Sequence, residues 1–287
     1  MRVVIVSMAA GVVANYVHLL AELGHETAGV LTMRNRRRPE TAGRVVAGVP
    51  DGVDAVVVGS AHRVAPLLRS YEADVGLCGG WGWKLGADAL SATRLGIVNG
   101  HPSLLPRWRG PNPFGWTLRA GDPEAGYTFH FMDEGFDTGP ILAQGSVPLS
   151  ANDSMTTLRE HVRGLEKELL PQALTRVASG DIGDPQSDDG ATYASVYEDA
   201  FAEIDWTRPA REVHNQIRCW FTPTVSGIMG PLTTLDGERV RVVEARIADA
   251  DASAAPGEIV GRDADGLLVQ CGDGPIRVLR TEPVPRD

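Results

Sequence analysis

Short apolar runs rich in β-branched residues alternate with segments of helical spacing through the first 100 residues. The runs predict strands at residues 2–7, 27–32, 55–58, 74–78 and 95–99, and the spacing predicts helices at 12–23 and 63–71. Strands that are apolar along their whole length are typical of a sheet covered on both faces. The pattern therefore predicts an α/β fold with a Rossmann-like, doubly wound and mainly parallel sheet.

The pattern changes along the second half of the chain. Residues 127–132 alternate, with Tyr127, Phe129 and Phe131 on one face and Thr128, His130 and Met132 on the other. Residues 154–179 predict a long helix with Ser154 as its N-cap. Short predicted strands then follow at 232–235, 240–247, 258–260, 267–270 and 276–280. They predict a small C-terminal β-barrel of the OB kind.

Composition divides the chain at a stretch rich in Gly, Asp and Ser near residue 180. We expect a first domain at 1–182, a linker at 183–203 and the OB-like domain at 204–287. The formal charge of −10 argues weakly against broad, non-specific binding of nucleic acid. Cys78, Cys219 and Cys271 are few and widely spaced, so we expect buried thiols, no cysteine metal site and a cytoplasmic protein. No apolar run reaches the length of about 20 residues that spans a bilayer.

Polar residues that could carry chemistry gather between residues 95 and 144. Asn99 and His101 end a predicted strand, and Asp137 lies in a later segment between Gly135 and Gly139. An amide can donate to an oxyanion, an imidazole can move a proton, and a carboxylate can orient the imidazole. These groups could transfer an acyl unit to an amine without a metal or a covalent intermediate.

The same block resembles the folate-dependent formyltransferase family, of the methionyl-tRNA formyltransferase or amino-sugar N-formyltransferase type. The resemblance rests on Asn99-Gly-His101 followed by Ser-Leu-Leu-Pro106, and on Asp137-Thr138-Gly139 at a separation of 137 − 101 = 36 positions. The second region also resembles the C-terminal domain of these enzymes. The resemblance implies that the chain takes a formyl group from 10-formyltetrahydrofolate by direct attack of an amine.

The resemblance also implies roles for particular residues. Asn99, His101 and Asp137 are the expected catalytic residues, and no metal ligand is expected. The expected co-substrate contacts are Trp83, Lys84, Leu85, Ser103, Met132 and Asp133. The expected acceptor contacts are Arg109, Gly110, Pro113 and His130; for His130, a hydrogen-bonded wall residue is an equal alternative.

The acceptor is less defined by the sequence. Residues 213–218 resemble the amino-sugar enzymes more than the tRNA enzymes, so we expect the primary amine of a small molecule, such as an amino sugar, nucleotide sugar or biosynthetic amine. Arg34 and Arg36–Arg38 could grip an anionic ligand or form a solvated basic loop. Methionyl-tRNA as acceptor and hydrolysis of 10-formyltetrahydrofolate remain alternatives. We expect no membrane partner and allow for a homodimer.

Two other classes are disfavoured. The residues after the first predicted strand lack the GxGxxG pattern of a nicotinamide-binding enzyme. The predicted strands from Leu232 onward carry no aromatic residue, which disfavours an OB-type module that stacks nucleic-acid bases.

Overall fold

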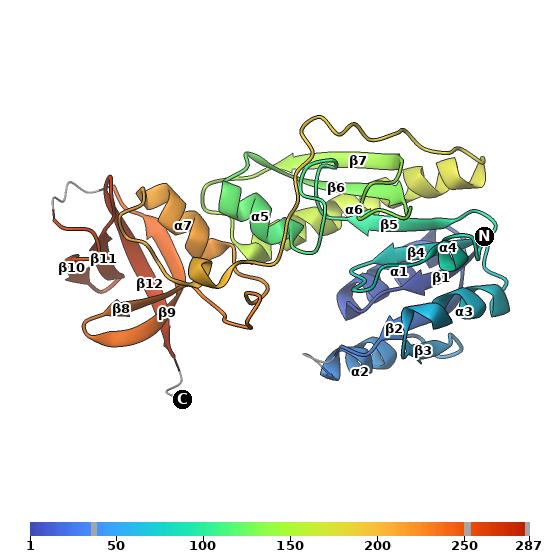
Figure 1. Ribbon diagram of the computed structural model, residues 1–287, viewed down its shortest axis with the longest axis horizontal. Helices are drawn as coiled ribbons and strands as arrows, with labels where there is room; N and C mark the ends of the chain where they lie inside the picture. The colour runs from blue at the N-terminus through green and yellow to red at the C-terminus, as the bar shows by residue number, and fades with distance from the viewer. Residues whose placement is uncertain (36–38, 250–253, 285–287) are drawn as a thin grey trace. The chain divides into compact units, whose positions relative to one another are not determined.

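The computed structural model describes residues 1–35, 39–249 and 254–284 (Figure 1). The chain divides into two compact units. The first contains Met1–Arg109, Gly126–Val147 and Val162–Thr192, and the second contains Gly110–Ala125, Pro148–His161 and Tyr193–Asp287. The polypeptide thus passes between the units several times.

A seven-stranded sheet forms the centre of the first unit. Its strands are β1 (Arg2–Val6), β2 (Glu26–Met33), β3 (Ala55–Val58), β4 (Val75–Gly79), β5 (Ile97–His101), β6 (Glu124–Phe131) and β7 (Ile141–Pro148). They lie in the order β3-β2-β1-β4-β5-β6-β7 (Figure 1). Strands β1 to β5 pair in parallel, and β6 pairs antiparallel to β5. The predicted doubly wound, mainly parallel sheet is confirmed.

Helices cover both faces of this sheet. On one face lie α1 (Ala10–Glu22) and α6 (Met155–Ala178). A hydrogen bond of 2.7 Å from Asn15 Nδ2 to Glu166 Oε2 joins these two helices. On the other face, α3 (Val64–Ser70) and α4 (Ala87–Leu90) bury Val64, Leu68 and Ala89 in a core with strand residues. Helix α2 (Glu40–Ala47) and the 3-10 turn η1 (Ala61–Arg63) complete the crossovers.

Helix α6 begins where the sequence predicts it. Ser154 Oγ accepts a hydrogen bond from the Thr157 backbone N–H at 3.3 Å, and Thr157 Oγ1 accepts one from the Ser154 N–H at 2.9 Å. This reciprocal pair satisfies two backbone donors that the first helical turn leaves without partners. The helix continues through Pro171 to Ala178.

The second unit contains helices α5 (Pro113–Ala120) and α7 (Ala210–Arg218) and the 3-10 turn η2 (Asp199–Ala202). Its sheet is antiparallel, in the order β10-β11-β12-β9-β8. The strands are β8 (Leu232–Leu235), β9 (Glu238–Ile247), β10 (Ile259–Asp263), β11 (Gly266–Gln270) and β12 (Pro275–Pro283). Asp236 and Gly237 take positive φ between β8 and β9, as a tight hairpin turn requires. The β-strands predicted for the C-terminal region are confirmed, and they form a small antiparallel sheet.

Cys78, Cys219 and Cys271 are buried, free thiols, as the sequence analysis predicts. Within the described ranges, no helix is both long enough and apolar enough to cross a membrane. Arg36–Arg38, part of the basic stretch singled out in the sequence, lie outside the described residues.

Candidate active site

Strands β5 and β6 bring four polar side chains to one face of the sheet. In their antiparallel register Asn99 pairs with His130, and His101 pairs with Thr128. Because side chains alternate along a strand, all four lie on the same face, while Gly100 and Phe129 lie on the opposite one. All four polar residues are buried, with Asn99 and His101 only 8% and 5% exposed. The alternation predicted for residues 127–132 therefore places His130 beside Asn99.

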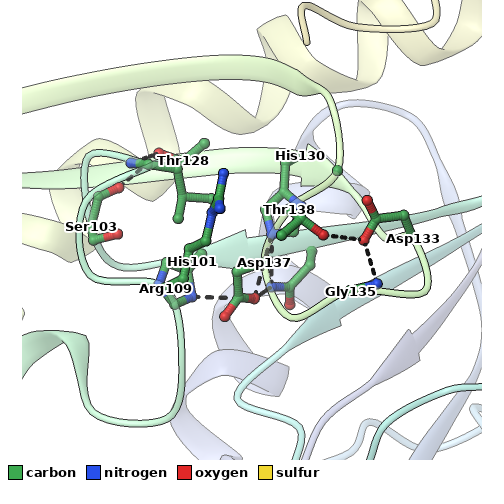
Figure 2. A network of polar contacts seen from close by, with 12 residues as sticks. His101, Ser103, Arg109, Thr128, His130, Asp133, Gly135, Asp137 and Thr138 are labelled. Atoms are coloured by element: carbon green, nitrogen blue, oxygen red, sulfur yellow. Dashed lines mark hydrogen bonds and ion pairs between the residues drawn. The ribbon is translucent and has the colours of Figure 1, made fainter. Parts of the chain in front are cut away.

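A short loop after β6 carries Asp137 into this group. Asp133 Oδ1 accepts hydrogen bonds from the Gly135 N–H at 2.9 Å and from Thr138 Oγ1 at 2.6 Å, which closes the loop on itself (Figure 2). A side chain at Gly139 would overlap the Phe131 carbonyl, so only glycine fits there. Asp137 itself takes a positive φ of 56°, which turns its carboxylate toward β5.

The Asp137 carboxylate is shared by three side chains. Its Oδ1 lies 3.3 Å from Asn99 Nδ2, 3.6 Å from His101 Nδ1 and 3.7 Å from His130 Nε2 (Figure 2). The Asp137 side chain is 18% exposed, more than either histidine. The structure thus brings together the three residues that the sequence analysis named as catalytic.

A backbone carbonyl fixes the tautomer of His101. His101 Nε2 lies 2.8 Å from the Trp108 carbonyl oxygen, which can only accept, so Nε2 carries the proton. In the neutral ring Nδ1 then offers its lone pair toward Asp137. Burial lowers the pKa of His101 below its ordinary value, and the Asp137 carboxylate offsets part of that effect. His101 is therefore a neutral base near pH 7, with Nδ1 as its basic atom.

The neighbouring His130 has the opposite arrangement. Its Nδ1 donates to the Phe131 carbonyl at 2.7 Å, which leaves Nε2 to accept a hydrogen bond from Asn99 Nδ2 at 3.1 Å. The two hydrogens of the Asn99 amide thus point at His130 and Asp137. Donation to a substrate oxygen would replace one of these contacts, of which the 3.3 Å contact to Asp137 is the longer.

The loop after β5 is held by hydroxyl and amide groups. Thr128 Oγ1 donates to the Ser103 carbonyl at 2.7 Å and accepts from Gln144 Nε2 at 2.8 Å. Ser103 Oγ, an expected co-substrate contact, donates to the Arg107 carbonyl at 2.7 Å. In this state the Ser103 hydroxyl therefore shapes the loop that ends at Trp108.

Gln186 is a residue of the site that the sequence analysis missed. Its Nε2 donates to the carbonyl oxygens of Asp137 and Gly139 at 2.9 and 2.8 Å. Its Oε1 accepts from Arg109 at 2.9 Å, and Arg109 also contacts Asp188 at 3.2 Å. Gln186 lies in the stretch expected to be a linker, where a lone glutamine carries no pattern that would single it out. It fastens the Asp137 loop to Arg109.

Three of the expected co-substrate residues, Trp83, Leu85 and Met132, belong to one apolar cluster. Leu85 is buried in the core, and Trp83 and Met132 pack against the same cluster. Lys84 Nζ lies 5.6 Å from the ring centroid of Phe136, the residue before Asp137. A cavity of about 1480 Å³ is lined by Trp83 together with Met8, Met33, Arg34 and Arg63, among others. The cavity is open to the surface, and of the expected co-substrate residues its described lining includes Trp83.

The expected acceptor contacts fall in different units. Arg109 and His130 belong to the first unit, with the residues described above, whereas Gly110 and Pro113 belong to the second. Pro113 is the first residue of α5, where proline is well tolerated because its missing N–H has no helical partner.

The geometry could support transfer of an acyl group between two nitrogens. A neutral imidazole can accept a proton from an attacking amine, an amide N–H can bind the oxyanion, and a carboxylate can stabilise the imidazolium that forms.

The chain matches the formyl transferase family model over residues 3–174 and the model of the formyl transferase C-terminal domain over residues 198–284.

Known proteins are similar to this chain in sequence or in fold. The chain is 35% identical over 283 residues to a methionyl-tRNA formyltransferase of Pseudomonas putida (strain W619), covering 94% of this chain and 87% of that one. HypX from Aquifex aeolicus superposes with a TM-score of 0.71 at 17% identity, over 99% of this chain and 46% of its own. The sugar 3N-formyl transferase WlaRD superposes with a TM-score of 0.65 at 15% identity, over 97% of each chain. From these matches and the site geometry, the chain belongs to the formyl transferase family and is a folate-dependent formyltransferase.

Proposed function

We propose that this enzyme transfers the formyl group to the amino group of methionyl-tRNA. The main support for this acceptor is the 35% identity to a methionyl-tRNA formyltransferase, which extends over 94% of this chain and 87% of the relative. It outweighs the expectation of a small-molecule amine, which drew on the likeness of residues 213–218 to the amino-sugar enzymes. The basic stretch from Arg34 onward also suits a phosphate-rich acceptor.

In the proposed reaction the amine attacks the formyl carbon of 10-formyltetrahydrofolate directly. Asn99 Nδ2 donates to the oxyanion, and His101 Nδ1 accepts the proton that leaves the amine. Asp137, 3.6 Å from that nitrogen, stabilises the imidazolium. His101 then returns the proton to the folate nitrogen as its bond to the formyl carbon breaks. One C–N bond forms, one breaks, and no proton is gained or lost.

Residues of the first unit suit the folate co-substrate. We propose that Trp83, Lys84 and Leu85 form one side of its site and Met132 and Asp133 the other, with Ser103 close by. The contact between Lys84 and Phe136 supports this proposal because it joins the two segments. Arg109, Gly110, Pro113 and His130 remain our proposed contacts for the acceptor.

A small-molecule amine is the second candidate, and the charge of the C-terminal region favours it. Residues 204–287 contain 10 arginines, no lysine and 13 acidic residues, a net charge of −3. Six arginines of the small sheet have carboxylate partners: Arg239, Arg241, Arg246, Arg262, Arg277 and Arg280. A phosphate backbone would have to displace these partners, so this region offers little of the attraction that tRNA binding uses.

A direct comparison of acceptors tests the proposal. The purified enzyme is supplied with 10-formyltetrahydrofolate and with charged initiator tRNA, a panel of amino sugars and nucleotide amino sugars, or no acceptor. We expect formyl-methionyl-tRNA to form with the highest kcat/KM. Faster formylation of an amino sugar would support the second candidate, and formate release without any acceptor would identify a hydrolase.

We also propose that the protein is cytoplasmic and that any assembly it forms is a homodimer.

We further propose that residues 1–182 and 204–287 are separate domains joined by residues 183–203. Limited proteolysis should cut first within 187–190, where four consecutive residues are exposed, because Asp184 and Gln186 just before them are held by hydrogen bonds.

A further inference from the structure

A buried hydrogen-bonded cluster lies on the face of the sheet opposite Asn99 and His101. Tyr16 from α1, Tyr127 from β6 and Glu166 from α6 form it. Tyr127 Oη lies 3.1 Å from Tyr16 Oη and donates to Glu166 Oε1 at 2.6 Å. The two tyrosines are 0% and 3% exposed, and Glu166 is 7% exposed. The proposed mechanism assigns no role to Tyr16, Tyr127 or Glu166.

The hydrogen bond from Tyr127 to Glu166 sets a direction for the rest of the cluster. Burial raises the pKa of both phenols well above the ordinary value, so both hydroxyls are protonated. Tyr127 donates to Glu166, and its oxygen can therefore accept the hydrogen of Tyr16. Asn15 Nδ2 donates to the second carboxylate oxygen at 2.7 Å. Each polar group is satisfied by another in the cluster, which makes the arrangement rigid and costly to disturb.

The cluster bears directly on the catalytic strand. Gly100 lies between Asn99 and His101 and pairs with Gly79 of β4. A side chain at Gly100 would overlap the hydroxyls of both Tyr16 and Tyr127, and a Cβ at Gly79 would lie 2.9 Å from the Tyr16 hydroxyl. The two phenols thus lie against bare backbone, directly behind the residues that carry the amide and the imidazole.

We propose that Tyr16, Tyr127 and Glu166 are positioning residues for formyl transfer. They fix the position of the β5 backbone at Gly100, perpendicular to the sheet. This position determines where Asn99 Nδ2 and His101 Nδ1 lie relative to the reacting atoms. The proposal rests on the proposed catalytic roles of Asn99 and His101. Displacement of a catalytic group by about 1 Å can cost on the order of 100-fold in rate, so small shifts of this strand matter.

Removal of one hydroxyl tests the proposal. In Tyr127→Phe, the Glu166 carboxylate and the Tyr16 hydroxyl both lose a partner. We expect kcat to fall about 10- to 100-fold with KM for both substrates changed less than threefold. The matched control is Tyr197→Phe, which removes another buried hydroxyl that donates to the Cys219 carbonyl at 3.2 Å, in the second unit. Its kcat should stay within twofold of the wild type.

Glu166 provides the conservative comparison. Glu166→Gln keeps the shape and can still pair with Asn15 and Tyr127, so it should retain most of the activity, whereas Glu166→Leu should behave like Tyr127→Phe. Thermal unfolding of each variant separates activity from stability. A lower Tm in Tyr127→Phe and Glu166→Leu with unchanged kcat per folded molecule would overturn the proposal, because a merely structural cluster behaves in that way.

A readout without turnover keeps the two proposals distinct. If the wild type formylates no acceptor, the proposed function fails, and the cluster is then tested through the NMR signals of the His101 imidazole. Those signals should move in Tyr127→Phe and remain in place in Tyr197→Phe. Unmoved His101 signals in Tyr127→Phe would refute the positioning role whatever the enzyme formylates.

Discussion

The His101 side chain shows how a backbone atom can select which ring nitrogen of a proposed catalytic residue is basic. The Trp108 carbonyl accepts from Nε2, which leaves Nδ1 as the base that faces Asp137. Trp108 takes a positive φ of 58°, unusual for a bulky residue, and this turn is part of how the carbonyl reaches the ring. The Asn-x-His spacing identifies the residue, but the choice of nitrogen depends on a loop seven residues later.

Substitution of the proposed base should remove most of the activity. His101→Gln can still donate to the Trp108 carbonyl but cannot exchange a proton, so we expect kcat to fall by about 10²–10⁴. Asn99→Ala should cost on the order of 10²–10³, as for one lost oxyanion donor. Steady-state kinetics measure both effects, with His18→Gln on the exposed side of α1 as the control. Near-normal turnover of His101→Gln would refute its role.

The pH dependence should report the buried imidazole. Because burial lowers the His101 pKa, the neutral base persists below pH 6.5 and is lost only as the pH falls further. We expect kcat/KM to decrease with an acid midpoint below 6.5. In Asp137→Asn the midpoint should move lower still, because the carboxylate that raises the pKa is gone. The His101→Gln profile reveals any limb due to the acceptor amine, and an Asp137→Asn midpoint above that of the wild type would contradict this assignment.

At the scale of elements, the site is assembled from β5, β6 and two loops. The strands set the register that places Asn99 beside His130, whereas the loop at 133–139 is held from outside by Gln186. The sequence predicts β5 and the alternation on β6 but not β7 or Gln186. Strand β7 contains Gln144, Gly145 and Ser146, ends at Pro148 and lies at the sheet edge, so its pattern is weak.

Loss of the Gln186 contacts should loosen the Asp137 loop. In Gln186→Leu two backbone carbonyls and Arg109 each lose one hydrogen-bond partner, so Asp137 samples more positions around His101. We expect kcat to fall about 10-fold, with an unfolding free energy lower by about 1–2 kcal/mol. Gln172→Leu, which removes only a helical side-chain contact at 3.2 Å on the exposed part of α6, is the control. Equal kcat in the two variants would exclude this role.

At the scale of the whole molecule, charge separates the two candidate acceptors. The chain carries −10 overall and −3 over residues 204–287, while Arg34 and Arg36–Arg38 form a local basic stretch. We therefore expect a tRNA acceptor to be bound through only a few contacts between arginine side chains and phosphates. Each such contact releases counterions from the tRNA when it forms.

The salt dependence of the acceptor KM measures those contacts. If methionyl-tRNA is the acceptor, log(1/KM) should fall linearly with log salt with a slope of about −2 to −4, for a few phosphate contacts. Substitution of Arg34, Arg36, Arg37 and Arg38 by Gln should flatten that slope. The KM of a neutral amino sugar, the control acceptor, should change little. A flat profile for methionyl-tRNA would argue against binding through its phosphates.

The sequence by itself determined the mainly parallel sheet, the β-rich second region and the identities of Asn99, His101 and Asp137, because local periodicity and a short motif carry that information. Tertiary structure alone decided which histidine nitrogen is basic, that Gln186 holds the Asp137 loop, and that Tyr16, Tyr127 and Glu166 lie behind Gly100. The contacts in these features join residues from 7 to 111 positions apart. Such contacts depend on the packing of elements distant in sequence, and no local pattern encodes them.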